Sequence, residues 1–416
     1  MITPDKALKT ILDNIPILDH EVISYRRSLG RILAEDIKAR NDAPCFDNSE
    51  MDGFAVKAQD LAGASKSSPR VLKIQGIVKA GDAPGLEVND HETLKIMTGA
   101  QLPKGANAVV MKEMSDEIGG GVVRIFQEPK RGEFIRKRGS DVRHGEVIIR
   151  ANTRIRSYEI AFLASQGIHK VSVYRKPKVA LIVTGDELLE ESESLKPGKI
   201  RNSNGPSLVS ILERWGAIPL NRGFVRDDVR LLESEIKKSL RSSDAVLVSG
   251  GVSVGDYDYT KSLLEKIGVK VILWKVAAKP GKPLLFGIYE PKAHQHLGSV
   301  RTNKPVFGLP GNPVSVLVSF EEFVLPALEK MQGYVLGVPA YSLAGEAENN
   351  FKTPKDRQQF LFCEARKDNG KFILKIIDPQ GSAMSGRVCR ANALAKAPIG
   401  PGIVKSGESL PFRWLK

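Results

Sequence analysis

Three times between residues 178 and 315, an apolar run of strand length ends in a loop rich in glycine or proline, and a helical pattern follows. The apolar runs are residues 179–183, 245–248 and 305–309. Uninterrupted apolar strands that alternate with helices are typical of a parallel sheet buried on both faces. Ligands of such sheets bind beyond the carboxyl ends of the strands. The pattern therefore predicts an α/β sheet domain over residues 177–331, with a site where the loops meet.

The loop of residues 249–258 carries the strongest signal for an anion site. It combines three glycines and two serines with Asp256 and Asp258, and a helical pattern begins at residue 259. Glycine brings backbone amides close to a phosphate, and a helix N-terminus favours negative charge. Two acidic side chains beside an anion fit a divalent cation that bridges them to it. The alternative is an ordinary turn in which Asp258 only caps the next helix.

Two neighbouring segments add charged groups at the same edge of the predicted sheet. Residues 275–283 present three lysines on a loop stiffened by proline and glycine, which suits an oxyanion, although a solvated basic loop remains the alternative. Asp227 and Asp228 precede a helical pattern, and one of them is expected to cap it. The edge thus offers both acids and cations around one pocket.

The flanking sequence predicts further domains. Residues 3–15 follow the spacing of an amphipathic helix, residues 71–126 alternate short β runs with turns, and residues 158–165 favour a short helix. Beyond residue 333, short strands return over about eighty residues, a length that suits a small barrel. We expect a multidomain α/β protein: a helical linker domain (1–24 and 144–176), a small β-rich domain (25–143), a doubly wound, mostly parallel sheet domain (177–331) and a C-terminal β-barrel (332–416).

Composition narrows the function classes. The chain has 62 basic and 48 acidic residues, a net charge of +14 that favours anionic partners. Aromatic residues make up only 6% and are not interleaved with lysine or arginine, which argues against nucleic acid. The three cysteines form no CxxC pair, so we expect a reducing compartment and no zinc site. With no signal peptide or apolar span in the sequence, a cytoplasmic location without membrane contact is predicted.

Together these motifs carry a family resemblance. Residues 47–53, 96–100, 138–141, 184–188, 249–258, 279–283 and 308–315 resemble, in order, the molybdopterin molybdenumtransferase family, which includes the E domain of gephyrin. The resemblance implies the last step of molybdenum cofactor synthesis, in which adenylylated molybdopterin and molybdate, with Mg²⁺, give the cofactor and AMP. It also implies an elongated homodimer whose site lies between the sheet domain of one subunit and the small β domain of the other.

The resemblance also assigns roles to matching positions. The implied Mg²⁺ ligands are Asp186, Glu187, Asp256 and Asp258. The implied catalytic residues are Glu187, Asp227 and Asp258, with Asp52, Thr98 and Asp141 from the opposing subunit. The implied substrate-binding residues are Thr184, Gly185, Ser249, Gly250, Gly251, Ser253, Gly255, Lys275, Lys279, Lys282, Pro283, Pro310, Gly311, Asn312, Pro313 and Ser382, of which the lysines, Pro283 and Ser382 would line the molybdate pocket.

Two positions depart from the family pattern. Phe362 stands where the family commonly has an arginine, so that molybdate ligand is missing or is supplied by Arg366, Arg387 or Arg390. Ser140 replaces an acidic residue that usually precedes Asp141. The alternative functions are the adenylyltransferase of the preceding step, which resembles the sheet domain alone, and a gephyrin-like scaffold. That adenylyltransferase and molybdoenzyme chaperones are also the expected partners.

Overall fold

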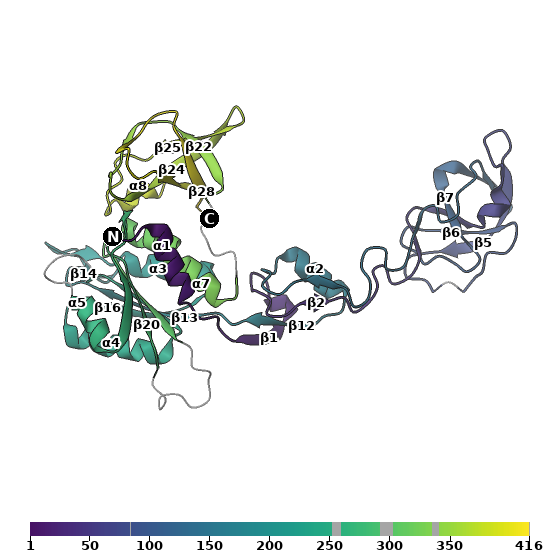
Figure 1. Ribbon diagram of the computed structural model, residues 1–416. Coiled ribbons are helices and arrows are strands. Elements are labelled where there is room, and N and C mark those ends of the chain that lie inside the picture. The colour runs from purple at the N-terminus through teal and green to yellow at the C-terminus, as the bar shows by residue number, and fades with distance from the viewer. Residues whose placement is uncertain (84, 252–258, 292–302, 335–340, 416) are drawn as a thin grey trace.

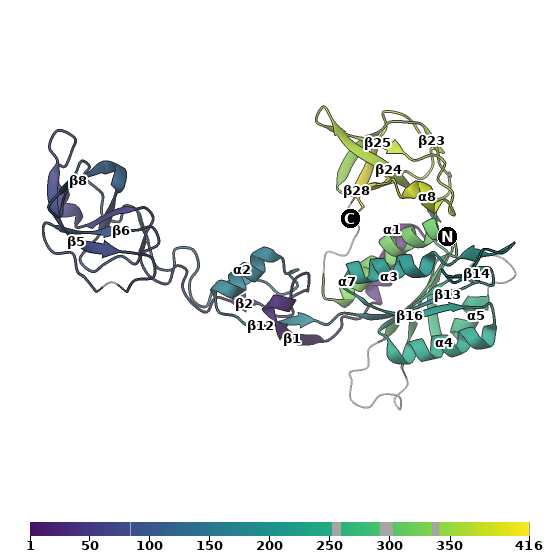
Figure 2. The same cartoon turned by 180° about the vertical axis from the view of Figure 1, so that it is seen from behind.

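The computed structural model describes residues 1–83, 85–251, 259–291, 303–334 and 341–415. The molecule is elongated: a sheet domain and a β-barrel lie at one end, a small β domain lies at the other, and a linker joins them (Figures 1 and 2). The predicted multidomain α/β architecture is confirmed. In these ranges, no helix is long and apolar enough to cross a membrane.

The sheet domain is built on six strands, and the three predicted apolar runs are neighbours at its centre. The order is β16 (Ile218–Val225), β13 (Lys178–Thr184), β17 (Ala245–Ser249), β21 (Lys304–Leu309), β20 (Leu285–Tyr289) and β18 (Val269–Trp274). Strand β20 runs in the direction opposite to the other five strands of this sheet. Because β13, β17 and β21 are parallel, their loops emerge at one edge, as the sequence predicts.

Helices cover both faces of this sheet, since alternate side chains of each strand point to opposite sides. Val179 and Leu181 of β13 share a core with α3 (Asn204–Arg214), and Ala180 and Ile182 share another with α4 (Val229–Ser242). On the first side also lie α6 (Pro313–Ser319), a π-helical turn (Phe320–Val324) and α7 (Leu325–Met331); α5 (Tyr259–Lys266) lies on the second. The strands of this sheet are therefore doubly wound.

Helix α1 (Pro4–Asp13) packs on the sheet domain beside α7 (Figure 1). Ala7 and Ile11 are fully buried in the same core as Leu181. We expected residues 1–24 to belong to the linker, but this apolar helical stripe finds its partner surface on the sheet domain. Within that segment, only β1 (His20–Ser24) pairs with the linker.

The linker and the small β domain consist of short strands. In the linker, β1 pairs with β12 (Lys170–Tyr174), β2 (Ile37–Lys38) pairs with β11 (Val147–Ile149), and α2 (Ser157–Ser165) packs beside them. The small domain has a mixed sheet in the order β7 (Ala108–Met111), β4 (Gly53–Val56), β6 (Glu92–Ile96), β5 (Arg70–Val78), β9 (Val122–Ile125) and β8 (Ser115–Gly119), with the pair β3 (Asn48–Ser49) and β10 (Ile135–Arg136) beside it.

The C-terminal domain is a closed barrel, as predicted. Its strands follow the order β24 (Gln358–Asp368), β25 (Lys371–Ile376), β22 (Leu343–Ala347), β28 (Ser409–Trp414) and β26 (Ala393–Ala397), and β26 pairs back onto β24. A two-residue strand of the sheet domain, β19 (Ala278–Lys279), adds to β24 in parallel. Helix α8 (Ser385–Val388) closes the side that faces the sheet domain.

A buried charged cluster fixes the barrel to the sheet domain. Arg413 of β28 lies 3.0 Å from Glu322 and 3.1 Å from Glu321, both in the π-helical turn, and the Tyr341 hydroxyl donates to Glu322 at 2.7 Å. Burial raises the pKa of the Tyr341 phenol well above its ordinary value, so this group remains a donor. The π-helical turn between α6 and α7 directs two successive carboxylates at one guanidinium.

Candidate active-site cleft

A cleft of about 960 Å³ lies where the three glycine-bearing loops of the sheet domain meet the barrel. Most of the predicted site residues that the structure describes line it. They are Thr184, Gly185, Glu187, Asp227, Gly250, Gly251, Lys279, Lys282, Pro283, Pro310, Gly311, Asn312, Pro313 and Ser382. Residues far apart in the sequence thus reach one cleft because parallel strands end at one edge.

Gly250 allows the first two loops to approach each other. It has a φ of +102°, and a Cβ at this position would lie 2.2 Å from the Thr184 carbonyl oxygen. Gly251 has a φ of +61° and is similarly crowded by Thr260. Any side chain here would push the loop away from β13, so the backbone of Gly250 and Gly251 stays at the cleft surface.

Asn204 ties the second and third loops together. Its side-chain amide donates to the Gly311 carbonyl at 2.8 Å and to the Ser249 hydroxyl at 3.1 Å. The Ser249 hydroxyl in turn donates to the Pro310 carbonyl at 3.1 Å. Ser249 is fully buried and does not line the cleft, so in this structure it positions the loops. Asn204 was not predicted from the sequence, because its partners Ser249 and Gly311 are distant in sequence.

The two aspartates before α4 have different partners. Asp228 is the cap of the helix, because one of its carboxylate oxygens accepts from the amides of Arg230 and Leu231 at 2.8 and 2.9 Å. Asp227 instead faces the cleft, where it accepts from the Thr184 hydroxyl at 2.6 Å. Of the two aspartates, Asp228 therefore caps the helix, and Asp227 is the one whose side chain lines the cleft.

Carboxylates that could hold a cation are gathered at the first loop. The Asp227 amide donates to the Asp186 carboxylate at 3.2 Å. The segment of Asp227 therefore lies against the turn that carries Asp186 and Glu187. Among the described residues, no group of three acidic, histidine or cysteine side chains is close enough to form a complete metal site. Asp256 and Asp258, with Ser253 and Gly255, lie outside the described residues. The donors present are hard oxygens, which suit Mg²⁺, an ion that proteins often bind through one or two carboxylates plus phosphate oxygens.

The cations of the cleft come from both domains. Lys279 and Lys282 line it from the sheet domain, and Arg357 lines it from the barrel. Lys275 does not line it, because its ammonium group lies 3.7 Å from the centre of the Trp274 ring. Ammonium and guanidinium groups are the usual partners of tetrahedral oxyanions.

Arg357 is a site residue that was not predicted from the sequence. The three arginines proposed to compensate for Phe362 are engaged away from the cleft: Arg366 pairs with Glu348, Arg390 pairs with Glu364, and Arg387 donates to the Asp378 carbonyl. Arg357 belongs to the turn before β24, and nothing in its local sequence marks it. It reaches the cleft because β24 pairs with β19, next to Lys279.

Ser382 links the barrel to the third loop. Its hydroxyl accepts from the Asn312 side-chain amide at 3.0 Å, and its carbonyl accepts from the Val314 amide at 3.0 Å. Asn312 stands at the cap position of α6, but its side chain makes no capping hydrogen bond and instead contacts Ser382 of the barrel. The two domains are therefore joined at the floor of the cleft.

Asp52, Thr98 and Asp141 lie in or beside the small β domain, at the opposite end of the molecule from the cleft (Figure 1). Asp52 accepts from the amide and the hydroxyl of Thr98, both at 2.7 Å, and these hydrogen bonds lower the pKa of its carboxyl. Within one chain, the structure does not bring these residues to the cleft.

Family models match two stretches of the chain. Residues 2–167 match the MoeA N-terminal region (domain I and II), and residues 180–330 match a probable molybdopterin binding domain. The molybdopterin molybdenumtransferase of Nostoc sp. strain PCC 7120 is 34% identical over 94% of this chain and 88% of its own length. The protein of the same name from Bacillus subtilis strain 168 is 34% identical over 98% of this chain and 93% of its own length.

A solved structure agrees along the whole chain. The molybdopterin biosynthesis MoeA protein of Pyrococcus horikoshii OT3 superposes with a TM-score of 0.83 and 30% sequence identity, and each chain is covered completely. The similarity therefore includes the linker and both β domains as well as the sheet domain that carries most of the cleft.

Proposed function

Because this chain belongs to the molybdopterin molybdenumtransferase family, we propose that its cleft inserts molybdate into adenylylated molybdopterin and releases AMP. One observation carries the proposal. The cleft combines Asp227 and the glycine loop, which suit a metal-bound pyrophosphate, with Lys279, Lys282 and Arg357, which suit a tetrahedral oxyanion.

The residues of the cleft bind and orient the two anions. The backbone of Gly250 and Gly251 approaches the pyrophosphate, since no side chain shields it. Lys279 and Lys282 hold molybdate beside it, and Ser382 adds a hydroxyl at the barrel side. Holding two anions in one geometry lowers the entropic cost of their reaction.

We further propose that Mg²⁺ binds at the acidic end of the cleft. Asp186, Glu187 and Asp227 would hold it together with Asp256 and Asp258. When bound, the ion neutralises charge on the phosphate oxygens. The Thr184 hydroxyl orients the Asp227 carboxylate by donating to one of its oxygens, and the Asp186 amide lies 3.4 Å from the other.

Catalysis in this proposal is electrostatic. Water attacks the pyrophosphate, so that one phosphorus–oxygen bond forms as the bond to AMP breaks, and the fixed cations of the cleft stabilise the negative charge that develops on the leaving AMP. No covalent intermediate with the protein is involved. Mass spectrometry of the protein during turnover tests this point, because an adenylylated or phosphorylated side chain would contradict it.

A second copy of the chain completes the site in our proposal. Asp52, Thr98 and Asp141 would reach the cleft from the small β domain of a partner subunit, which the elongated shape of the molecule permits (Figure 2). All three cysteines are free, which supports a cytoplasmic location.

The decisive experiment measures the release of AMP. Purified protein is mixed with adenylylated molybdopterin, molybdate and Mg²⁺, and release of AMP is measured against samples that lack molybdate or contain a chelator. We expect release that depends on both. Release independent of molybdate contradicts the proposal, and consumption of ATP with free molybdopterin would instead identify an adenylyltransferase.

A further inference from the structure

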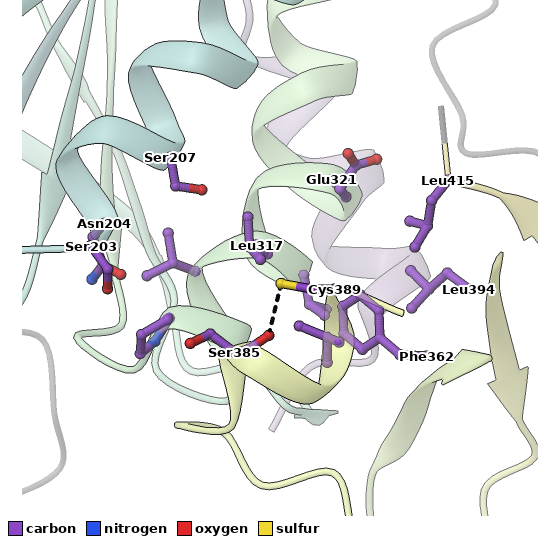
Figure 3. A pocket seen from close by; sticks show the side chains of 14 residues that line it. Ser203, Asn204, Ser207, Leu317, Glu321, Phe362, Ser385, Cys389, Leu394 and Leu415 are labelled. Atoms are coloured by element: carbon purple, nitrogen blue, oxygen red, sulfur yellow. Dashed lines mark hydrogen bonds between the residues drawn. The ribbon is translucent and has the colours of Figure 1, made fainter. Parts of the chain in front are cut away.

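A second, smaller hollow of about 300 Å³ adjoins the cleft (Figure 3). Its walls come from α3, α6 and the barrel, and they are mainly apolar, with Leu317 on the sheet-domain side and Phe362, Val388 and Leu394 on the barrel side. We call this hollow the ring pocket. It is chemically unlike the cleft, which is lined by acids, lysines and arginines.

The ring pocket and the cleft are adjacent. Ser203, Asn204, Pro313 and Ser385 line both of them. A ligand with one part in the cleft and another in the ring pocket would pass these four residues. Ser385 lies three residues after Ser382, so the connection opens on the barrel side of the cleft, close to the proposed molybdate ligands.

The start of α3 adds a polar edge to these apolar walls. Ser203, Asn204 and Ser207 lie along one side of the ring pocket (Figure 3). Both amide hydrogens of Asn204 are used in contacts with Gly311 and Ser249, so its carbonyl oxygen is the group left to accept a hydrogen bond. Apolar walls with a few polar groups at one edge are typical of pockets for flat heterocyclic rings.

We infer that the ring pocket holds the pterin ring of the substrate, while the cleft holds the pyrophosphate and molybdate. This inference rests on the proposed function. It also gives a role to Phe362, which is buried and lines the ring pocket where the family commonly has an arginine. An aromatic side chain there extends the apolar wall, so the departure from the family pattern favours the face of a ring over an oxyanion.

The substrate contains a second ring, the adenine, and the chemistry of the reaction decides between the two. Molybdate is transferred to the sulfur atoms next to the pterin, so the pterin lies close to the oxyanion ligands. The ring pocket adjoins the cleft at Pro313 and Ser385, and Ser385 lies three residues after Ser382, on that side. The adenine lies beyond the pyrophosphate, which the loop at Gly250 is placed to bind.

Filling the ring pocket tests the inference through kinetics. Leu317→Trp places an indole in the ring pocket, and we expect the KM for adenylylated molybdopterin to rise about tenfold or more, with the KM for molybdate unchanged. The matched control is Leu231→Trp, because Leu231 is exposed on α4, on the other face of the sheet. A variant L317W that is folded and has wild-type KM values would overturn the inference, while turnover by the wild type would still support the proposed function.

A thiol provides a test that needs no turnover. Cys389 is exposed and lines the ring pocket, where its Sγ lies 3.4 Å from the Ser385 carbonyl oxygen (Figure 3). Cys45 is also exposed and is removed by Cys45→Ser, whereas burial raises the pKa of Cys363 to about 12 and keeps it unreactive near neutral pH. In the variant C45S, the rate of alkylation therefore reports on Cys389.

The probe is neopterin, a pterin that has no thiol to consume the alkylating reagent. We expect saturating neopterin to slow alkylation of Cys389 at least severalfold, and AMP or molybdate to leave the rate unchanged. Protection by AMP would show that the ring pocket binds the adenine. The absence of protection by neopterin would show that it does not bind a pterin. Either result overturns the inference. If neopterin protects Cys389 in C45S but the wild type releases no AMP, the proposed function fails and the pterin site stands.

Discussion

The cleft and the acidic loops of the small β domain were both predicted from short polar motifs, yet they differ in how their charges are used. In the small domain, Asp42 accepts from Arg138, Asp47 accepts from Lys137, and Asp52 accepts from Thr98. In the cleft, neither Lys279 nor Lys282 has an ion-pair partner within the part of the chain that the structure describes. The carboxylates of these loops are used within the small domain, whereas Lys279 and Lys282 of the cleft remain available for a ligand.

The two regions are also attached differently. The barrel shares a buried charged cluster, a two-residue strand and a common cleft with the sheet domain. The small β domain is connected through the narrow linker alone (Figure 1). The cleft is therefore built from elements that are joined within one chain, whereas the small domain contributes to it only in the proposed dimer, and this difference gives predictions for both regions.

The largest effect is expected from Asp227→Asn. Loss of the carboxylate charge at the cleft should lower AMP release by a factor on the order of 100 to 1,000 without unfolding the protein. The control is Asp228→Ala, one residue away, which should lower the free energy of unfolding by about 1 kcal/mol through loss of the helix cap and leave the rate nearly unchanged. Equal activities of the two variants would show that Asp227 has no role in the chemistry.

Mixing two inactive variants tests whether the two regions cooperate across subunits. Asp52→Ala and Asp227→Ala should each be inactive, and a mixture allowed to exchange subunits should recover about a quarter of wild-type AMP release. Half of the random dimers are then mixed, and each mixed dimer has one intact site. Sites built within single chains would recover no activity, which would limit the small domain to a structural role.

Removing Arg413 tests the attachment of the barrel. Arg413→Met leaves Glu322 buried without its cation, and breaking such a pair costs about 3 kcal/mol of stability near neutral pH. Burial raises the pKa of Glu322 in the folded state above its value in the unfolded chain, so the folded state binds a proton more tightly. The free energy of unfolding of this variant should therefore fall as pH rises from the unfolded pKa of Glu322 through its folded pKa. Urea unfolding at pH 5 and pH 8 measures this, and the double variant R413M/E322Q should lose the pH dependence.

The smallest effect concerns the acidic loops. Thr98→Val removes the hydroxyl that donates to Asp52 but keeps the backbone amide, which makes the larger contribution to lowering the pKa of this carboxyl. We expect the pKa of Asp52 to rise part of the way toward its ordinary value, as measured by NMR titration of the carboxyl carbon. In the wild type, the ionised Asp52 carboxylate stabilises the folded state at any pH above the ordinary pKa of the unfolded chain. This stabilisation is lost as pH falls through the lowered pKa of the folded state. An unchanged pKa would show that the amide alone holds the charge.

The sequence predicts those parts of the fold and site that depend on local pattern. The runs that form β13, β17 and β21 are apolar throughout because both faces of the sheet are covered, and their loops had to meet at one edge. In contrast, β16 contains Asn221, Arg222 and Gly223, because an edge strand with exposed positions does not need an apolar run. This strand could not be recognised from its composition.

The residues that were missed or reassigned depend on tertiary contacts. Asn204, Arg357 and Ser249 each owe their role to a segment that is distant in sequence: the third loop, strand β19, and the Pro310 carbonyl. Lys275 has the same residue type and loop as Lys279, yet the neighbouring Trp274 ring holds its ammonium. Residue type predicts what a side chain can bind, but the packing around it determines whether it faces the ligand.

Strand β19 limits how this protein can be divided. Ala278 and Lys279 pair with Gln358 and Gln359 of the barrel, so a segment of the sheet domain that carries Lys279 is part of the sheet of the barrel. A chain shortened before residue 341 would lose this backbone partner of Lys279, together with Arg357 and Ser382, and would uncover the part of the sheet-domain core that Phe360 and Phe362 fill. We therefore expect that a gene fusion or a shortened chain with the sheet domain alone keeps the loops proposed to bind the pyrophosphate, whereas the proposed molybdate site cannot be transferred without the barrel.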